Sequence, residues 1–255
     1  NSRSGFSDDI RPSSRRVGTS VEVRDIFKNI PARLKFLRSD KVEGKAIFDI
    51  VRAIALAYPE VSFLLVDVTS PERRKVLLDV TSEEDDEKLF NRLKQILGER
   101  FSENCMLLSE ETSKYKLYGY ASLPTNTASS ATNQYFFVNR RPLRDRQLIS
   151  WLRSAYYDFV PRDRYASAVL CLTCNYNLVD INVHPMKSEV RFEEPSEIRG
   201  LLYSAVKRAL SENGLKTNRA LSFKATNSFK LTGKNPYIAE SLPEESQNGL
   251  NFIMK

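Results

Sequence analysis

The sequence predicts a mixed α+β protein, and three observations support this. Apolar residues recur at helical spacing in several stretches, most clearly at 43–58, 145–159 and from Pro195 onward. Short runs rich in β-branched and aromatic residues, such as 61–68 and 166–174, lie between them and predict strands. Hairpin-like and crossover-like connections are mixed along the chain, so the pattern alone leaves α+β and layered α/β arrangements open.

The first half of the chain begins with polar residues 1–16, rich in Arg and Ser, which predict a loop. Val17 to Val23 alternates apolar and polar residues and predicts a half-buried strand. Pro31 suits the first turn of a short helix, and Pro59 ends the next helix. The remaining predictions for this half are a helix at 43–58, strands at 61–68 and 75–80, and a helix at 89–97.

The second half is predicted to form a sheet with two helices and a final linker or tail. The predicted strands are 114–121, 134–138, 166–174, 178–183 and 188–192, and the predicted helices are 145–159 and 195–209. The acidic run near 81–87 marks a change in composition, and from Gly214 onward polar residues dominate. These changes predict domains at 1–85 and 86–213, followed by a linker or disordered tail at 214–255.

The charge balance favours an anionic partner. Lys and Arg total 39 against 32 Asp and Glu, a net charge of +7, which suits nucleic acid or nucleotide phosphates, although solubility alone also explains it. No stretch approaches the ~20 apolar residues that cross a bilayer, so no membrane partner is expected. Three cysteines, an odd number, fit a reducing compartment. The chain starts at Asn, so we interpret it as a fragment or a processed product.

Metal and histidine chemistry receive little support. Cys171 and Cys174 have a C-x-x-C spacing, but only Cys105 and the sole histidine, His184, could complete a four-ligand zinc site. Residues three apart on a strand point to opposite faces, so we expect buried thiols and no metal. His184 has no nucleophile motif beside it and is interpreted as a turn residue. The sequence also contains neither a P-loop nor a G-x-G-x-x-G motif.

Two stretches carry groups that suit phosphate. Between a predicted strand and a predicted helix lie four arginines within seven positions: Arg140, Arg141, Arg144 and Arg146. Guanidinium groups are planar, always charged and able to bind phosphate with two hydrogen bonds, although a solvated helix start explains the cluster equally well. Lys187 lies at the tip of a tight turn after Pro185, where a fixed ammonium would suit a phosphate.

Three stretches together resemble the MutL family of DNA mismatch repair proteins. The family pattern G-T-x-V-x-V-x-x-L-F-x-N-x-P-A-R-x-K-F-L is similar to GTSVEVRDIFKNIPARLKFL at 18–37. The pattern V-N-x-R-x-x-x-D is similar to VNRRPLRD within 136–148, and V-D-V-N-V-H-P-x-K-x-E-V-R-F is similar to VDINVHPMKSEVRF at 179–192. The resemblance covers about 17–212, and residues 214–255 match nothing comparable.

The resemblance implies a fold and a function. The fold is the C-terminal part of a GHKL (gyrase–chaperone–histidine kinase–MutL) ATPase α/β sandwich, followed by a ribosomal protein S5 domain 2-like domain. The function is that of a matchmaker that dimerises with ATP bound, binds DNA and couples mismatch recognition to strand incision. Implied partners are DNA, a second copy or a paralogue, a MutS-type mismatch-recognition protein and a downstream nuclease. The implied location is the bacterial cytosol, or the nucleus in a eukaryote.

The resemblance also assigns roles to single residues. Gly18 and Thr19 match the last nucleotide-site motif, and Lys187 matches a second-domain lysine that reaches the γ-phosphate of ATP. Asn182 is expected to support the turn that carries this lysine. The four arginines lie where the family resembles a DNA-contacting or interdomain surface.

The departures from the family pattern concern mainly the nucleotide site. The E-x-x-x-N segment with the catalytic Glu and the metal-binding Asn, and the D-x-G-x-G motif, are missing from the sequence and are expected upstream. We therefore expect no catalytic residue and no metal ligand in this chain, ATP and Mg²⁺ only in the complete protein, and no ATP hydrolysis by this chain alone. Smaller departures are Lys28, Arg140 and Met186, where the family has an aromatic, a glycine and a small residue.

Two alternative interpretations remain open. The chain could be a non-catalytic DNA- or partner-binding module on a degenerate ATPase remnant. It could also be an ATPase subunit of a type II topoisomerase, which joins the same two domains, but the NVHPxK and PARxKFL stretches favour MutL.

Overall fold

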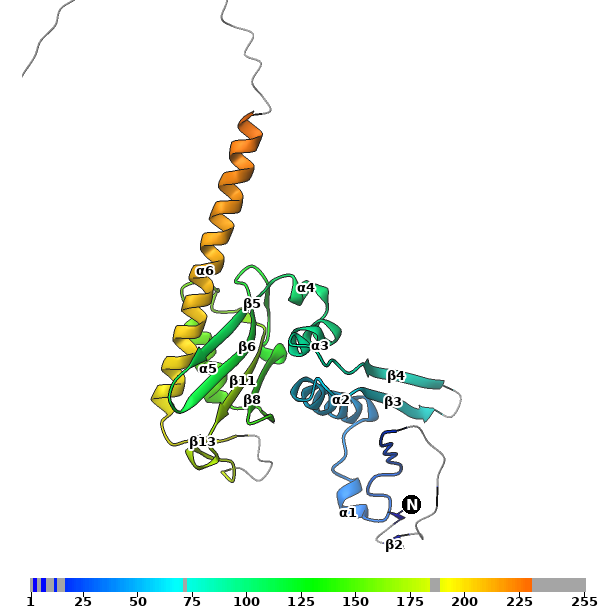
Figure 1. Ribbon diagram of the computed structural model, residues 1–255. Helices are drawn as coiled ribbons and strands as arrows, with labels where there is room; N and C mark the ends of the chain where they lie inside the picture. Colours follow the sequence, from blue (N-terminus) through cyan, green and yellow to red (C-terminus); the bar gives the residue numbers. More distant parts are fainter. Residues whose placement is uncertain are drawn as a thin grey trace, which may run out of the picture. The chain divides into compact units, whose positions relative to one another are not determined.

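The computed structural model describes residues 2–3, 6–7, 12, 17–70, 73–183 and 189–230, with backbone only for 2–3, 6–7, 70, 73 and 215–230 (Figure 1). The chain divides into two compact units, Asn1–Lys207 and Arg208–Lys255, and each is described by itself. The helices are α1 (Pro31–Leu34), α2 (Asp40–Ala57), α3 (Lys88–Leu97), α4 (Glu99–Ser102), α5 (Arg146–Ala155) and α6 (Pro195–Lys230). The strands are β1 (Ser2–Arg3), β2 (Phe6–Ser7), β3 (Phe63–Ser70), β4 (Arg73–Val80), β5 (Cys105–Glu111), β6 (Tyr115–Ser122), β7 (Thr127–Ala128), β8 (Gln134–Val138), β9 (Arg141–Leu143), β10 (Tyr165–Ala166), β11 (Ala168–Cys174), β12 (Val179–Asp180) and β13 (Arg191–Phe192).

The centre of the first unit is a five-stranded sheet with the order β5-β6-β11-β8-β9. All neighbours are antiparallel except β8 and β11, which run parallel from the Ala168–Gln134 pair to the Leu172–Val138 pair. A parallel pair needs a crossover, and the chain supplies it between β8 and β11 through β9, α5 and β10. The turn from β8 into β9 therefore lies at the start of this crossover.

Helices cover both faces of this sheet, as the alternation of side chains along β8 illustrates. Tyr135 and Phe137 belong to a cluster with α2, α3 and α4, whereas Phe136 and Val138 face α5 and the beginning of α6. Successive residues of a strand point to opposite faces, so β8, an apolar run buried from Tyr135 to Val138, serves two cores.

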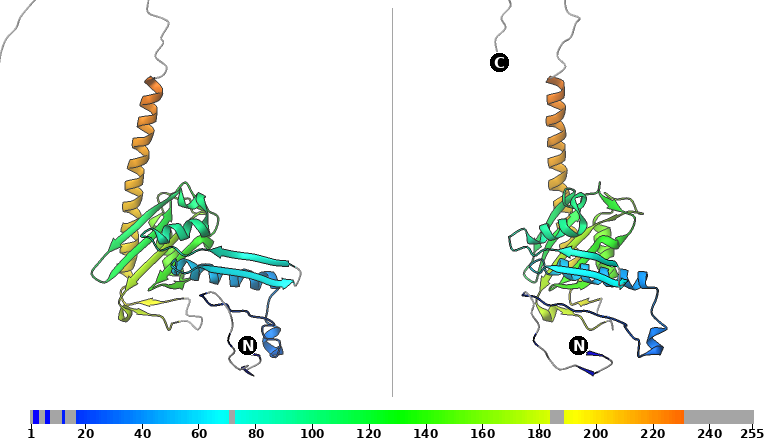
Figure 2. Two further views of the ribbon diagram at one scale, coloured as in Figure 1. Left: turned by 45° about the vertical axis from the view of Figure 1, so that its right-hand side comes forward. Right: turned by 90° about the vertical axis from the view of Figure 1, so that its right-hand side faces the viewer.

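A smaller layer lies beside α2, where β3 and β4 form an antiparallel hairpin along the helix (Figure 2). Leu78 and Val80 of the hairpin pack with Ala55 of α2 in a second core cluster. The opposite side of the hairpin carries exposed apolar residues, including Leu64 and Val76. The helix α2 thus packs one row of side chains against the hairpin and another row against the central sheet.

Most of the predicted elements are confirmed. The mixed helix and strand content confirms the predicted α+β class. The helix predicted at 43–58 is α2, the helix at 145–159 is α5, and Pro31 occupies the first turn of α1. The strand predicted at 134–138 is β8. No helix in the described ranges combines the length and hydropathy that crossing a membrane requires.

Three predicted strands differ from the structure, the strand β5 was missed, and one helix is longer than predicted. Val17 to Val23 form no strand, and Val17, Val21 and Val23 are all exposed, because no described segment pairs with them. The strand β5 was not predicted, since its polar end breaks the apolar pattern. The predicted strands at 178–183 and 188–192 are shorter, and as β12 and β13 they form a separate two-stranded sheet instead of completing the central one. The helix α6 extends to Lys230, into the segment predicted as a linker or tail.

Candidate functional site

The arginine-rich stretch begins at a tight turn between β8 and β9. Asn139 and Arg140 have positive φ angles, 48° and 67°, the conformation of the two-residue type I′ turns that match strand twist. The Asn139 side chain donates to the carbonyl of Cys174 and accepts from its amide, both at 3.0 Å. The turn is therefore anchored to the end of β11, and the position of Arg140 is fixed.

Arg140 makes two contacts with the segment that follows α2. Its Nη1 donates to Oε1 of Glu60 at 2.5 Å, and its guanidinium lies 5.4 Å from the centre of the Tyr58 ring. The φ of 67° at Arg140 is strained for a non-glycine residue and costs on the order of 1 kcal/mol of conformational free energy. The side chain remains 54% exposed, so part of the guanidinium is accessible to another ligand.

Glu60 is held as a carboxylate. Burial raises the pKa of Glu60, but hydrogen bonds from its own backbone amide and from Arg140, together with the positive charge of Arg140, outweigh burial and lower the pKa below its usual value. Its second oxygen, Oε2, is buried without a hydrogen-bond partner in the described part of the chain. The carboxylate is therefore stabilised first by its own backbone amide and then by Arg140.

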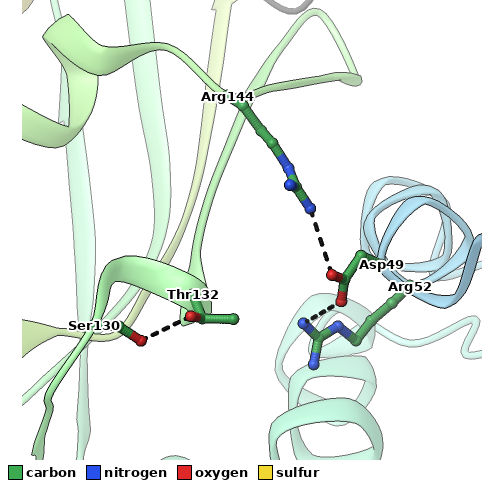
Figure 3. A network of polar contacts seen from close by, with 5 residues as sticks. All are labelled: Asp49, Arg52, Ser130, Thr132 and Arg144. Carbon is green, nitrogen blue, oxygen red and sulfur yellow. Dashed lines mark hydrogen bonds and ion pairs between the residues drawn. The ribbon is translucent and has the colours of Figure 1, made fainter. Parts of the chain in front are cut away.

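Arg144 points toward Asp49 of α2 (Figure 3). Its Nη2 lies 3.9 Å from Oδ2 of Asp49, and Oδ1 of the same carboxylate accepts from Arg52 at 3.1 Å. Arg52 is placed by its neighbours, since its guanidinium lies over the rings of Phe48 and Tyr135 at 5.1 and 5.3 Å. Asp49 is therefore shared between a fixed, largely buried arginine and the 74% exposed Arg144.

The other two arginines differ in their surroundings. Arg141 is half-buried on β9 and has a polar partner. Arg146 is exposed at the first position of α5 and forms no ion pair with the described residues. A cation at the N-terminal end of a helix opposes the helix dipole. Helix stability therefore does not account for Arg146.

Asp145 caps α5 directly before Arg146. Its Oδ1 accepts from the backbone amides of Gln147 and Leu148 at 2.7 and 3.1 Å, and its side chain is nearly fully buried. We expect Asp145→Ala to lower the free energy of unfolding by about 1–2 kcal/mol, because two backbone amides at the helix start, one of them buried, lose their acceptor. Urea unfolding followed by circular dichroism measures this. Asp145→Asn keeps an acceptor and should lose less, and an unchanged midpoint for Asp145→Ala would contradict the capping role.

The described part of the chain does not bring together the residues that were expected to bind ATP. Gly18 and Thr19 lie in an exposed segment without regular structure, and a Cβ on Gly18 would meet nothing within 4 Å. Asn182 is exposed, and its backbone amide donates to Oδ1 of Asp180 at 2.8 Å, which forms a local turn. Lys187 lies outside the described residues, as does His184.

The described residues do not fit ATP with Mg²⁺ by themselves. The backbone around Gly18 is open and encloses nothing, and no described group of three or more His, Cys, Asp and Glu side chains could hold a metal ion. Cys171 and Cys174 are free thiols on β11, and burial raises the pKa of Cys171 to about 12. Their position on a strand confirms that part of the interpretation, but both residues are half-buried and not fully buried.

Comparisons with known proteins identify the family. A family model described as "DNA mismatch repair protein, C-terminal domain" matches residues 93–211. The DNA mismatch repair protein MutL of Rickettsia bellii is 38% identical over 240 residues, which cover 93% of this chain and 39% of that protein. MutL of Brucella anthropi is 39% identical over 232 residues, 91% of this chain and 36% of that one. The chain belongs to the MutL family.

One solved structure is similar in fold to this chain. A crystal structure of the N-terminal domain of a DNA repair protein superposes with a TM-score of 0.63 at 16% identity, covering 74% of this chain and 60% of that one. This likeness shows that most of the chain shares its mixed α/β fold with that domain. The chain spans less than two-fifths of the length of the two MutL relatives named above.

Sequence reasoning located the arginines of this MutL-family chain but missed their acidic partners. Asp49 and Glu60 carry no motif and precede the arginines by 80 or more residues. The only local signal concerned Asp49, which lies three residues before Arg52 on a predicted helix. Side chains at this spacing lie on one face of a helix and can form an ion pair, as these two do.

Proposed function

We propose that this chain is part of a MutL-type matchmaker that dimerises in an ATP-dependent manner and couples mismatch recognition to strand incision. Family membership supports this, together with the order and length of the three matching stretches. The proposed partners are DNA, a second copy or a paralogue, a MutS-type protein and a downstream nuclease. The proposed location is the bacterial cytosol, or the nucleus in a eukaryote.

The nucleotide part of the proposal concerns the complete protein. Gly18, Thr19, Asn182 and Lys187 are proposed to contribute to an ATP site, because they occupy matching positions in the family motifs. The catalytic Glu and the Mg²⁺ ligand are proposed to come from residues outside this chain, because the E-x-x-x-N segment and the D-x-G-x-G motif are missing from its sequence. The domains at 1–85 and 86–213, and the linker or tail at 214–255, remain part of the same proposal.

The DNA contact is proposed for Arg140, Arg141, Arg144 and Arg146. The observation that carries this proposal is the placement of Arg146, an exposed cation at a helix start where it opposes the dipole. Asp145 already caps the helix amides, so a phosphate would be bound by the arginine side chains. Such contacts orient the duplex but carry no sequence information.

Salt dependence tests this contact. We expect Arg146→Ala to weaken binding to duplex DNA about equally for different sequences, and to reduce the slope of log affinity against log salt by about 1. Fluorescence anisotropy with a labelled duplex oligonucleotide at several salt concentrations measures both. The matched control is Arg199→Ala, which removes an exposed arginine from α6. Equal effects of the two substitutions would show that Arg146 contributes only net charge.

A further inference from the structure

Two of the arginines proposed to bind DNA are held by carboxylates from a distant segment. Glu60, three residues after the end of α2, binds Arg140, and Asp49 on α2 lies beside Arg144. Both carboxylates come from the segment before residue 86, and both arginines lie on the β8–β9 turn or just after β9. The two pairs therefore connect two parts of the chain that also pack together in the core cluster of α2, α3 and β8.

We propose that Asp49 and Glu60 compete with DNA phosphates for Arg144 and Arg140, and so form an autoinhibitory contact on the DNA-binding surface. This inference rests on the proposed DNA contact and adds its regulation. A carboxylate offers a guanidinium the same kind of charged oxygen acceptor as a phosphate. DNA can use the full donor set of Arg140 only after Arg140 leaves Glu60, which occupies its Nη1. Arg144 lies 3.9 Å from Asp49, beyond hydrogen-bond distance, so there the competition is between the charge of the carboxylate and that of the phosphate.

The geometry allows this exchange. The side chains of Arg140 and Arg144 are 54% and 74% exposed, so a phosphate can approach both without a change in the fold. Ion pairs at such exposure are worth little, so they lower DNA affinity without preventing binding.

The two acids should not contribute equally. Glu60 contacts Arg140 through a hydrogen bond of 2.5 Å, whereas Asp49 lies 3.9 Å from Arg144 and already binds Arg52 at 3.1 Å. Replacement of Glu60 should therefore raise DNA affinity more than replacement of Asp49. Both substitutions remove one negative charge, so an effect of net charge alone would be about equal for the two. A larger effect of the Glu60 substitution therefore indicates direct competition for Arg140.

The experiment is a double-mutant cycle with the whole chain and a labelled duplex oligonucleotide. We expect Glu60→Gln to tighten binding about two- to fivefold, Asp49→Asn to tighten it less, and the effect of Glu60→Gln to vanish in an Arg140→Ala background. The matched control for charge is Glu84→Gln, which removes an exposed carboxylate in the loop before α3. Circular dichroism confirms that each variant remains folded.

The outcomes separate this inference from the proposed function. If Glu60→Gln acts no more strongly than Glu84→Gln, or keeps its full effect without Arg140, competition is overturned while the DNA contact stands. If Arg140→Ala and Arg144→Ala both bind DNA as tightly as the unmodified chain, the contact of these two arginines and the autoinhibition are overturned together.

Discussion

Replacing Gly119 with alanine is expected to lower the free energy of unfolding by more than about 3 kcal/mol. Gly119 lies in the middle of β6 with a φ of 155°, paired with Leu170 of β11. A Cβ at this position would lie 2.1 Å from the carbonyl oxygen of Val169 and 3.0 Å from the Cα of Leu170. These are backbone atoms of a central strand, so they can move only if the β6–β11 pairing breaks. Urea unfolding monitored by circular dichroism measures the loss.

The chain provides a control with the opposite sign. Gly44 lies within α2, where an added Cβ would meet nothing within 4 Å. Alanine is favoured over glycine inside a helix, so Gly44→Ala should raise the free energy of unfolding by about 0.5–1 kcal/mol. If the same substitution at Gly119 is tolerated as well as at Gly44, then the close approach of β6 and β11 is not what requires glycine there.

Replacing Arg92 with methionine is the second large expected effect. Arg92 is fully buried on α3, and its guanidinium donates to the carbonyls of Ala55, Pro59, Val61 and Thr81 at 2.6–3.0 Å. These carbonyls belong to the end of α2, the loop before β3 and the segment after β4. Methionine fills the volume but leaves the acceptors without donors. The expected loss exceeds about 3 kcal/mol, measured by the same urea unfolding.

Two further variants test the cause of this loss. Arg92→Lys keeps the charge but should also destabilise strongly, since an ammonium cannot reproduce the planar spread of guanidinium donors. Arg100→Met, at an exposed position on α4, should change the free energy of unfolding by less than about 0.5 kcal/mol. A near-neutral Arg92→Met would mean that the four carbonyls find other donors.

The fold was predictable from sequence wherever one segment carried its own periodic pattern. The helices α2 and α5 and the strand β8 have a continuous apolar stripe or run, and their positions were predicted correctly. The alternation at Val17–Val23 was misleading because a strand also needs a neighbour to pair with. The strand β5 was missed for the opposite reason, since its pairing with β6 decides its structure despite the polar residues at its end.

The candidate site was predictable only as a set of positions. The density of arginines between a predicted strand and a predicted helix selected Arg140 and Arg144. Contacts that bridge 80 or more residues leave no periodic trace, so Asp49 and Glu60 could not be found. Arg92 was missed for a related reason. An arginine on a helix is normally exposed, and only the backbone carbonyls that converge on it reveal a buried role.

The order of strands in the central sheet has a consequence for biosynthesis. The strand β11 lies between β6 and β8, yet it is the last strand of this sheet to leave the ribosome. The β5–β6 and β8–β9 hairpins can form earlier because their partners are close in sequence. Until residue 174 has emerged, the edges of β6 and β8 that β11 will join stay unpaired, and both strands are rich in apolar residues, the kind of edge that promotes aggregation. The sheet is thus completed from its centre, and a chain interrupted before β11 would leave these two inner edges open in addition to the outer edges of β5 and β9.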